Sequence, residues 1–332
     1  MLNIDTPKPF QQVTEDIIIK IAKNLRKEYE IENLCLAGGV ALNCVANGKI
    51  LKEKIFKNIW IQPAAGDAGG SLGAALGYWY NELKMERSNK NIDSMRCSYL
   101  GPEYSNEKIK DILIDIGAKF ETLTNDKLLD FTTDKLTEGK AVGWFQNKME
   151  FGPRALGGRS ILGDARSPEM QKKLNLKVKF RESFRPFAPA ILLEDLNEWF
   201  DLDSESPYML LVGKVKEDKL IEQTPDQKSA KGLEKLNIIR SKIPAVTHVD
   251  NSARIQTVTA ENGIYYDLIK SFKKKTGCPV IVNTSFNVRG EPPVNTPVDA
   301  YKCFMATDLD ILVLGNCVME KQNQINFNLD IE

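Results

Sequence analysis

Residues 31–75 have the sequence IENLCLAGGVALNCVANGKILKEKIFKNIWIQPAAGDAGGSLGAA. This stretch alternates between apolar runs typical of strands and glycine-rich turns that lead into helices. The apolar run at residues 31–37 predicts a buried strand. It leads directly into Gly38 and Gly39, after which a helix is expected to continue to about residue 54. A strand that delivers a glycine-rich turn to the start of a helix is a building unit of α/β proteins.

The same order occurs again within this stretch. Residues 58–62 predict a second strand, Pro63 ends it, and the glycine-rich residues 66–73 open another helix. Apolar residues at helical spacing over residues 13–28 predict an amphipathic helix ahead of both units. The first part of the chain therefore predicts an α/β layer.

Both glycine turns place backbone N–H groups at helix N-termini, where those groups and the helix dipole favour a phosphate. Asn43 lies just inside the helix after the first turn, and Asp67 lies in the second turn. This pattern is typical of a nucleotide or metal–nucleotide site. Two structural interpretations stand beside it, because glycines also allow tight packing and Asp67 is a suitable helix cap.

Composition limits the kind of protein. The chain has 332 residues, of which 42% are hydrophobic, and its 45 basic residues balance 45 acidic ones. No stretch predicts a membrane-spanning helix or a secretory signal, so we expect a cytoplasmic protein without a membrane partner. A net charge of zero argues against nucleic acid as a partner. The cysteines are far apart and predict reduced thiols.

A polar segment divides the chain. Residues 89–99 lose the apolar period and predict a linker between a first domain, residues 1–88, and a second domain, residues 100–322. The expected fold class is α/β, with an α+β second domain. Within it, residues 216–243 are charged and poorly periodic, which indicates a surface loop, an insertion or a lid.

Positive charge is concentrated in residues 143–191, which carry ten Lys and Arg against four Asp and Glu. Arg154 and Arg159 follow turns that contain glycine, and Arg185 lies in a proline-rich segment that cannot be helical. Arginine suits bidentate contact with phosphate. The stretch therefore predicts a site for a small anion, although a solvated basic surface is the alternative.

The end of the basic stretch adds a geometric expectation. If residues 177–181 are extended, Lys177, Lys179 and Arg181 share one face of the strand. Like charges at that spacing repel one another unless an anion lies over them.

His248 is the only histidine of the chain and lies six residues before Arg254. This mixture is typical of an acid–base group or of a group that orients phosphate, although a lone histidine is also a common structural residue. Because the chain has one histidine, any metal or catalytic site that needs two histidines is excluded unless another chain supplies the second.

Polar residues also follow a predicted strand near the end of the chain. Asn283, Ser285 and Asn287 come directly after the apolar residues 280–282. Their amides and hydroxyl suit a small ligand rich in oxygen, whereas turn formation is the structural alternative.

At these residues the chain resembles the O-carbamoyltransferase family, which includes the nodulation-factor, cephamycin and tobramycin carbamoyltransferases. The runs that carry the resemblance are LCLAGGVALNCVANGK, IQPAAGDAGGSLGAALG, GWFQNKMEFGPRALGGRSIL, NLKVKFRESFRPFAPAI, THVDNSARIQTV and NTSFNVRGEP. The resemblance implies an actin-like ATPase-fold domain joined to a YrdC-like domain. It further implies that the YrdC-like domain forms carbamoyl adenylate from carbamoyl phosphate and ATP, with Mg²⁺, and that the actin-like domain binds iron and transfers the carbamoyl group to a hydroxyl-bearing acceptor.

The resemblance also implies roles for individual residues. Those expected to act in catalysis are Lys179, Arg181, His248 and Arg254. Those expected to bind substrate or nucleotide are Gly38, Gly39, Asn43, Arg154, Arg159, Arg185, Asn283, Ser285 and Asn287. Asp67 is the expected metal ligand.

Compared with the family, the chain is expected to be a C-terminal portion only, with the first domain incomplete. On this interpretation transfer depends on a separate polypeptide that supplies the N-terminal half, and iron binds only if a partner chain provides the histidine ligands. The alternative is a nucleotide-binding regulatory or relic module without turnover.

Overall fold

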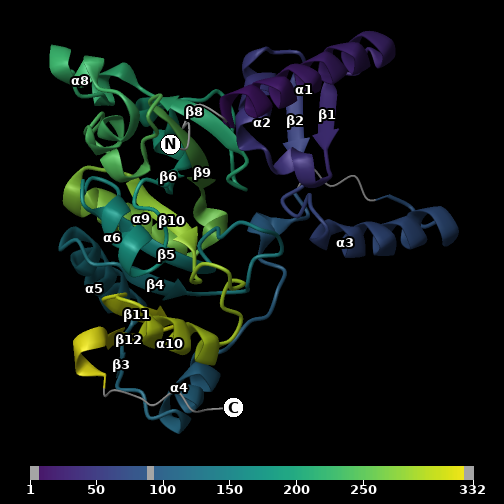
Figure 1. Ribbon diagram of the computed structural model, residues 1–332. Helices are drawn as coiled ribbons and strands as arrows, with labels where there is room; N and C mark the ends of the chain where they lie inside the picture. The colour runs from purple at the N-terminus through teal and green to yellow at the C-terminus, as the bar shows by residue number, and fades with distance from the viewer. Residues whose placement is uncertain (1–6, 88–92, 325–332) are drawn as a thin grey trace.

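The computed structural model describes residues 7–87 and 93–324, and Figure 1 shows their arrangement. The helices are α1 Pro7–Tyr29, α2 Cys44–Lys52, α3 Ala68–Gly77, α4 Asn106–Asp115, α5 Asn125–Thr137, α6 Met170–Lys177, α7 Leu196–Trp199, α8 Pro225–Ser229, α9 Ile264–Thr276 and α10 Pro297–Ala306. The strands are β1 Asn33–Leu36, β2 Asn58–Ile61, β3 Glu121–Thr122, β4 Val142–Phe145, β5 Arg159–Asp164, β6 Ala188–Leu192, β7 Phe200–Asp201, β8 Leu211–Val215, β9 Ser252–Val258, β10 Val280–Ser285, β11 Ile311–Leu314 and β12 Cys317–Glu320.

The first unit comprises α1, β1, α2, β2 and α3, and it confirms the predicted order of helices and strands. Strand β1 pairs in parallel with β2, as the α/β pattern requires. One expectation was wrong, because β1 is not a buried strand and its Cys35 is exposed. A sheet of two strands has no inner strand, so each strand keeps an open edge.

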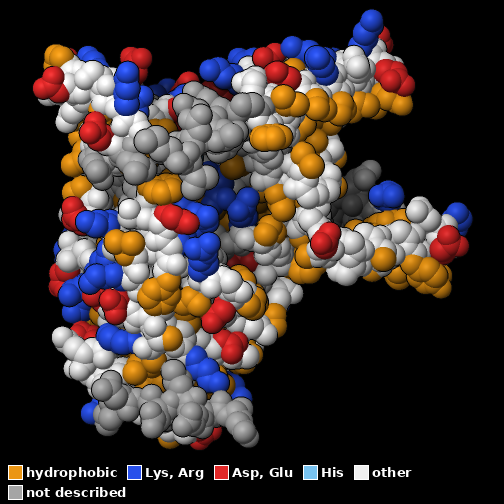
Figure 2. Space-filling model, viewed as in Figure 1, with side chains coloured by type: hydrophobic (Ala, Val, Ile, Leu, Met, Phe, Trp, Pro, Cys, Tyr) orange, Lys and Arg blue, Asp and Glu red, His pale blue; other side chains and the backbone are white. Residues whose placement is uncertain are grey.

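Helix α1 does not bury the apolar face that its sequence suggests. Ile19 and Ala22 are buried in a small core with residues of α2 and β2, whereas Val13, Ile17 and Ile21 are each more than half exposed. Figure 2 shows a band of hydrophobic side chains, in orange, along α1. Periodicity identified the helix correctly, but it did not identify the face that packs.

A mixed sheet forms the second unit. Its strand order is β3-β12-β11-β4-β5-β10-β6-β9-β8-β7, with parallel and antiparallel pairs. The inner strands are mostly buried, and their apolar side chains form the main core together with those of the helices and loops. Helices α5 and α9 pack against each other and on these strands. The chain is thus of mixed α/β class.

Residues 177–181 are not extended, which corrects the expected shared face of Lys177, Lys179 and Arg181. Helix α6 runs through Lys177, and Phe180 has a positive φ of 48°. The buried side chains Met170, Leu174 and Val178 are four residues apart, which is helical spacing.

The proposed linker falls partly outside the described residues, since 88–92 are not among them. Of the remainder, Met95, Cys97 and Ser98 are buried against the second unit. Residues 216–243 contain only short helical segments, including α8. Within 7–87 and 93–324, no helix is long and apolar enough to cross a membrane.

The two units meet where α2 packs on β8 (Figure 1). The Asn47 amide donates to the carbonyl of Leu210 at 3.2 Å, and Gly48 lies so close that an added Cβ would come 2.8 Å from the carbonyl oxygen of Val212. The loop after β4 reaches the same junction, where Gly152 lies against Pro63.

Candidate anion-binding site

The loop at residues 151–158 positions Arg154, and Glu150 holds that loop together. The buried Glu150 carboxylate accepts backbone N–H groups from Leu156 at 2.6 Å, Gly158 at 2.8 Å and Arg159 at 3.1 Å. Charge-assisted bonds of this kind are stronger than neutral ones. These bonds hold the loop around one carboxylate, so Arg154 within the loop has a defined position.

Arginines from three parts of the sequence line one cavity of about 250 Å³. Its lining consists of Pro153, Arg154, Ala155, Arg181, Pro186, Phe187, Ala188, Met209, Arg254, Asn283, Thr284 and Ser285. Strands β6, β9 and β10 are neighbours in the sheet and bring these segments together. The lining holds three guanidinium groups and no carboxylate, and Figure 2 shows Lys and Arg side chains gathered in the hollow beside the first unit.

The positive charge of this cavity is not neutralised within the described residues. The guanidinium group of Arg254 has no hydrogen bond or ion pair there, and the buried Nε of Arg154 has no partner. Burial, with the nearby Arg154 charge, lowers the pKa of Arg254 to about 10, and burial also lowers the pKa of Arg154 and of Arg181. Buried like charges are unfavourable without a counter-charge, so the cavity is suited to an anion.

Two of the arginines are nevertheless held in place by neutral groups. Arg181 donates from Nε to the Asn175 side-chain oxygen at 2.7 Å and lies over the Phe187 ring. Arg154 donates from Nη2 to the Leu42 carbonyl at 3.3 Å, which ties the cavity to the first unit. These contacts orient the guanidinium groups without cancelling their charge.

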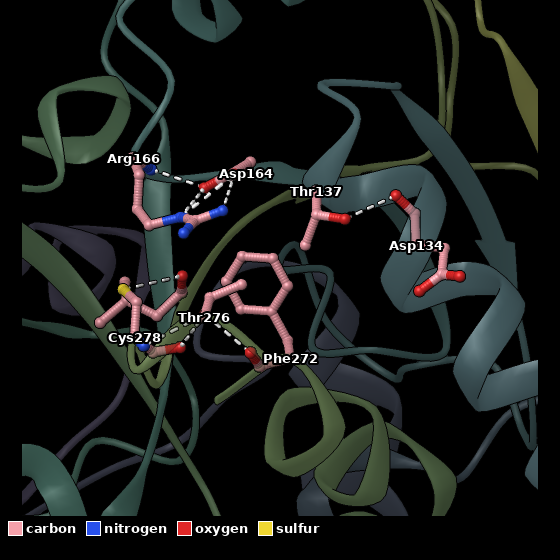
Figure 3. A network of polar contacts seen from close by, with 8 residues as sticks. Asp134, Thr137, Asp164, Arg166, Phe272, Thr276 and Cys278 are labelled. Carbon is pink, nitrogen blue, oxygen red and sulfur yellow. Dashed lines mark hydrogen bonds and ion pairs between the residues drawn. The ribbon is translucent and has the colours of Figure 1, made fainter. Parts of the chain in front are cut away.

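Two other arginines of the basic stretch make their contacts within the protein, although the buried Nε of Arg159 has no partner among the described residues. Figure 3 shows Arg166 in a two-pronged pair with Asp164, with an Nη2–Oδ2 distance of 2.6 Å. Arg159 is fully buried and donates to the carbonyls of Gln146 and Pro102, and its guanidinium lies 3.5 Å from the Phe145 ring centre. Arg159 does not line the cavity, and these contacts give it a structural use, so its expected binding role stays a prediction.

Lys179 lies behind the cavity and does not line it. Its ammonium group donates to the Ser285 carbonyl, to the Asn287 carbonyl at 2.9 Å and to Asn287 Oδ1 at 2.8 Å. Burial and the charge of Arg181 lower the pKa of Lys179 to about 7. The side chain therefore holds the turn at residues 285–287, and Asn287 serves the same turn and does not face the ligand space.

Two of the remaining predicted residues lie near the cavity without lining it. Arg185 is exposed and pairs with Glu182 at 3.3 Å, and its positive charge contributes to the lowered pKa of Arg181. His248 has its pKa lowered by burial, and the charge of Arg254 acts on it.

The hydrogen bonds around His248 fix its tautomer. Its Nδ1 lies 3.0 Å from the Ser252 hydroxyl, which donates its proton to Asp250 at 2.6 Å. Because that hydroxyl has only one proton, Nδ1 of His248 is the donor and Nε2 is left as the basic nitrogen.

The glycine turns of the first unit do not line the arginine cavity. Gly38 has a φ of 98° and donates to the Ala65 carbonyl. Asn43 caps α2, accepting from the Ala46 N–H at 3.1 Å, and exchanges hydrogen bonds with Gln11. Gly39 is exposed. A structural use therefore accounts for Gly38 and Asn43.

Asp67 lies at the start of α3 and is exposed, but its side chain makes no capping bond. In the part of the chain that the structure describes, no three His, Cys, Asp or Glu side chains lie close enough to hold a metal ion. Asp67 and the single histidine thus do not fit an iron centre, and we derive no step through iron.

Sequence reasoning missed the residues that organise the site. Glu150 and Asn175 are buried, and each holds an element that carries a cavity arginine. An acidic residue just before a glycine-rich loop was an available signal for Glu150. Nothing in the run around Asn175 distinguishes it from a surface residue of α6.

Comparisons with known proteins agree with the motifs. Residues 133–321 match the family described as "Carbamoyltransferase C-terminus", and residues 4–76 match "Carbamoyltransferase N-terminus". The chain is 54% identical to an uncharacterized protein of Synechocystis sp. over 324 residues, which is 97% of this chain and 53% of the relative. It is 39% identical to nodulation protein NolNO of Sinorhizobium fredii, covering 96% of this chain and 44% of the relative.

A third relative carries a more specific name. The 3'-hydroxymethylcephem-O-carbamoyltransferase of Streptomyces clavuligerus is 31% identical over 306 residues, which cover 92% of this chain and 52% of the relative. The chain spans about half the length of the curated relatives it matches.

The N-terminal match corrects one expectation. The sequence motifs predict a C-terminal portion only, but residues 4–76 match the N-terminal family and residues 133–321 match the C-terminal one. Both parts are therefore represented, and the interpretation as a C-terminal portion was wrong. The chain belongs to the carbamoyltransferase family.

Proposed function

We propose that this chain takes part in O-carbamoyl transfer, with the arginine cavity as the place where carbamoyl phosphate binds and is converted with ATP to carbamoyl adenylate. The observation that carries the proposal is the set of Arg154, Arg181 and Arg254 around a space with no carboxylate in its lining. Cationic groups aimed at a phosphate are the usual form of electrostatic catalysis in phosphoryl chemistry.

The proposed reaction has a definite balance. Water splits the bond between the carbamoyl group and its phosphate to give carbamate and orthophosphate, and a carbamate oxygen then forms a bond to the α phosphorus of ATP as the bond between the α and β phosphates breaks. The products are carbamoyl adenylate, pyrophosphate and orthophosphate, and one water is consumed. In this scheme the arginines bind the negative charge of reactants and leaving groups.

The size of the cavity limits what it holds. Its volume of about 250 Å³ lies below the roughly 300 to 1,000 Å³ typical of pockets for drug-sized ligands. An acyl phosphate and part of a polyphosphate fit, and the nucleoside of ATP must extend beyond it. Mg²⁺ would be held by the phosphates of the nucleotide, because the lining offers it no carboxylate.

Transfer to an acceptor hydroxyl is the second part of the proposal. It is supported by the family matches and by a relative named as an O-carbamoyltransferase. We place acceptor binding at the first unit, whose turn before α2 touches Arg154 through Leu42. We also propose that the region matched to the N-terminal family belongs to an actin-like domain. The region matched to the C-terminal family would belong to a YrdC-like domain.

The test is product formation by the purified chain with ATP, Mg²⁺ and carbamoyl phosphate. We expect pyrophosphate and orthophosphate in equal amounts, and Arg181→Ala should lower the rate by about a hundredfold because it removes one charged contact to the phosphate. Lys172→Ala, an exposed cation of the same stretch, is the matched control and should keep the rate. ATP binding without pyrophosphate, or equal rates for both variants, would contradict the proposal.

A further inference from the structure

Asn283 is a buried polar side chain of the cavity whose position is tightly defined. It lies on β10, the strand between β5 and β6, and is paired with Leu162 on one side and Ala188 on the other. Its residue exposure is 1%. Because the backbone is fixed on both sides, the side chain can change position only by rotating about its own bonds.

Two carbonyl oxygens of the loop 151–158 decide which way the Asn283 amide points. Its nitrogen donates to the Ala155 carbonyl at 3.0 Å and to Gln256 Oε1 at 2.7 Å, and the Gln256 nitrogen donates to the Leu156 carbonyl at 2.8 Å. Backbone carbonyls only accept, so neither amide can be turned round without losing its bonds. The Oδ1 atom of Asn283 must therefore lie on the opposite side of the amide.

That oxygen is buried and has no donor partner among the described residues. Buried polar atoms of native proteins are nearly always paired, so an exception calls for an explanation. The other unpartnered buried atom of the cavity lining is Arg154 Nε, which is a donor. Both residues line the cavity, so a ligand that offers acceptors to the arginines and an N–H donor to Asn283 would satisfy both atoms.

We propose that Asn283 Oδ1 accepts a hydrogen bond from the amide N–H of the carbamoyl group, and so selects carbamoyl phosphate over acyl phosphates that lack the amide. This inference rests on the proposed function, and it assigns the selection step to one atom. Acetyl phosphate is the sharpest comparison, because a methyl group stands where carbamoyl phosphate has its amide. If acetyl phosphate bound, the buried Oδ1 of Asn283 would stay without a hydrogen-bond donor, and the affinity for this analogue would be lower.

Titration calorimetry of the full chain with carbamoyl phosphate, acetyl phosphate and inorganic phosphate tests this. The wild type should bind carbamoyl phosphate about ten- to a hundredfold more tightly than acetyl phosphate, the range expected for one buried hydrogen bond. Asn283→Ala should lower the affinity for carbamoyl phosphate by that factor and change the affinity for acetyl phosphate by about twofold or less. The selectivity ratio, and not the affinity alone, is the measurement.

Asn175→Ala is the matched control. Asn175 is also a buried asparagine near the cavity, but both ends of its amide are paired, with Arg181 and with the carbonyls of Ser183 and Arg185. Its loss should weaken both acyl phosphates by a similar factor and leave the ratio unchanged. Asn283→Thr, which suits a strand and can still donate to the Ala155 carbonyl, replaces the alanine variant if that variant does not fold.

The outcomes separate the two proposals. Equal wild-type affinities for carbamoyl phosphate and acetyl phosphate, or a parallel loss of both in Asn283→Ala, would overturn the assignment of Asn283 while leaving the anion site intact. Failure of the wild type to bind any of the three phosphates would overturn the proposed function and this inference together.

Discussion

The ammonium group of Lys179 lies among oxygen acceptors of residues 285 and 287, yet burial and the charge of Arg181 lower its pKa to about 7 from the ordinary value of 10.5. Between these two values the unfolded chain holds a proton that the folded chain has released. Stability rises with pH wherever the unfolded state binds more protons. The charged form of Lys179 thus opposes folding below about pH 7, and this cost disappears as the pH rises.

We expect the free energy of unfolding of the wild type to increase from about pH 7 to about pH 9, with at most about 1.4 kcal/mol per pH unit from this one group. Lys179→Met should lose that increase, because methionine does not titrate. Lys177→Met is the control, since Lys177 is exposed and paired only weakly with Asp308. Urea unfolding at the two pH values measures the difference. A rise in Lys179→Met equal to that of wild type would show that Lys179 does not cause it.

At the scale of elements, the loop 151–158 is the part of the site that depends most on one side chain. Glu150 accepts two backbone N–H groups of this loop and the N–H of Arg159 just after it. Gly157, with a φ of 110°, lies so close to the Tyr265 ring that an added Cβ would overlap it. The loop is therefore fixed by a carboxylate on one side and an aromatic ring on the other. Arg154 takes its position from this arrangement.

Glu150→Gln should cost roughly 1–3 kcal/mol of stability. In the wild type the backbone N–H groups bond to carboxylate oxygens, whereas in the variant the glutamine NH₂ would face some of these donors. The affinity for inorganic phosphate should fall as well, since Arg154 would no longer be held in place. Glu169→Gln, an exposed glutamate of the same stretch, should change neither quantity. Thermal unfolding and phosphate titration give the two measurements. A variant that loses stability but keeps phosphate affinity would show that the loop is not needed to position Arg154.

The sequence predicted elements better than it predicted side-chain surroundings. The alternation at residues 31–75 gave the correct order of helices and strands, and the motifs around Arg154, Arg181 and Arg254 pointed to segments that do converge. That convergence depends on β6, β9 and β10 being neighbours in the sheet, and no local pattern reveals strand order.

Side-chain partners were harder to predict because they depend on distant residues. Arg159 and Arg154 look alike in sequence, since each follows a turn with glycine. In the structure, one meets the carbonyls of Gln146 and Pro102 and the other faces the cavity. The exposed face of α1 was missed for a related reason, because periodicity does not state which face meets a neighbour.

At the scale of the whole molecule, the close contact of α2 with β8 couples the two units. Helix α2 approaches β8 at Gly48, where an added Cβ would come 2.8 Å from the Val212 carbonyl oxygen. The Leu42 carbonyl that accepts from Arg154 belongs to the turn just before this helix. The position of the first unit and the position of a cavity arginine are thus linked.

Gly48→Ala tests that link. Alanine favours a helix over glycine by about 1 kcal/mol, but overpacking against backbone costs typically about 1–3 kcal/mol, so we expect a net loss of stability. Gly73→Ala in α3 is the matched control, because nothing lies within 4 Å of its added Cβ and only the helical gain remains. Phosphate affinity should fall in Gly48→Ala alone, since moving α2 displaces the Leu42 carbonyl from Arg154. If both variants gain stability and bind phosphate like the wild type, the units are not coupled through this contact, and Arg154 is positioned by its own loop.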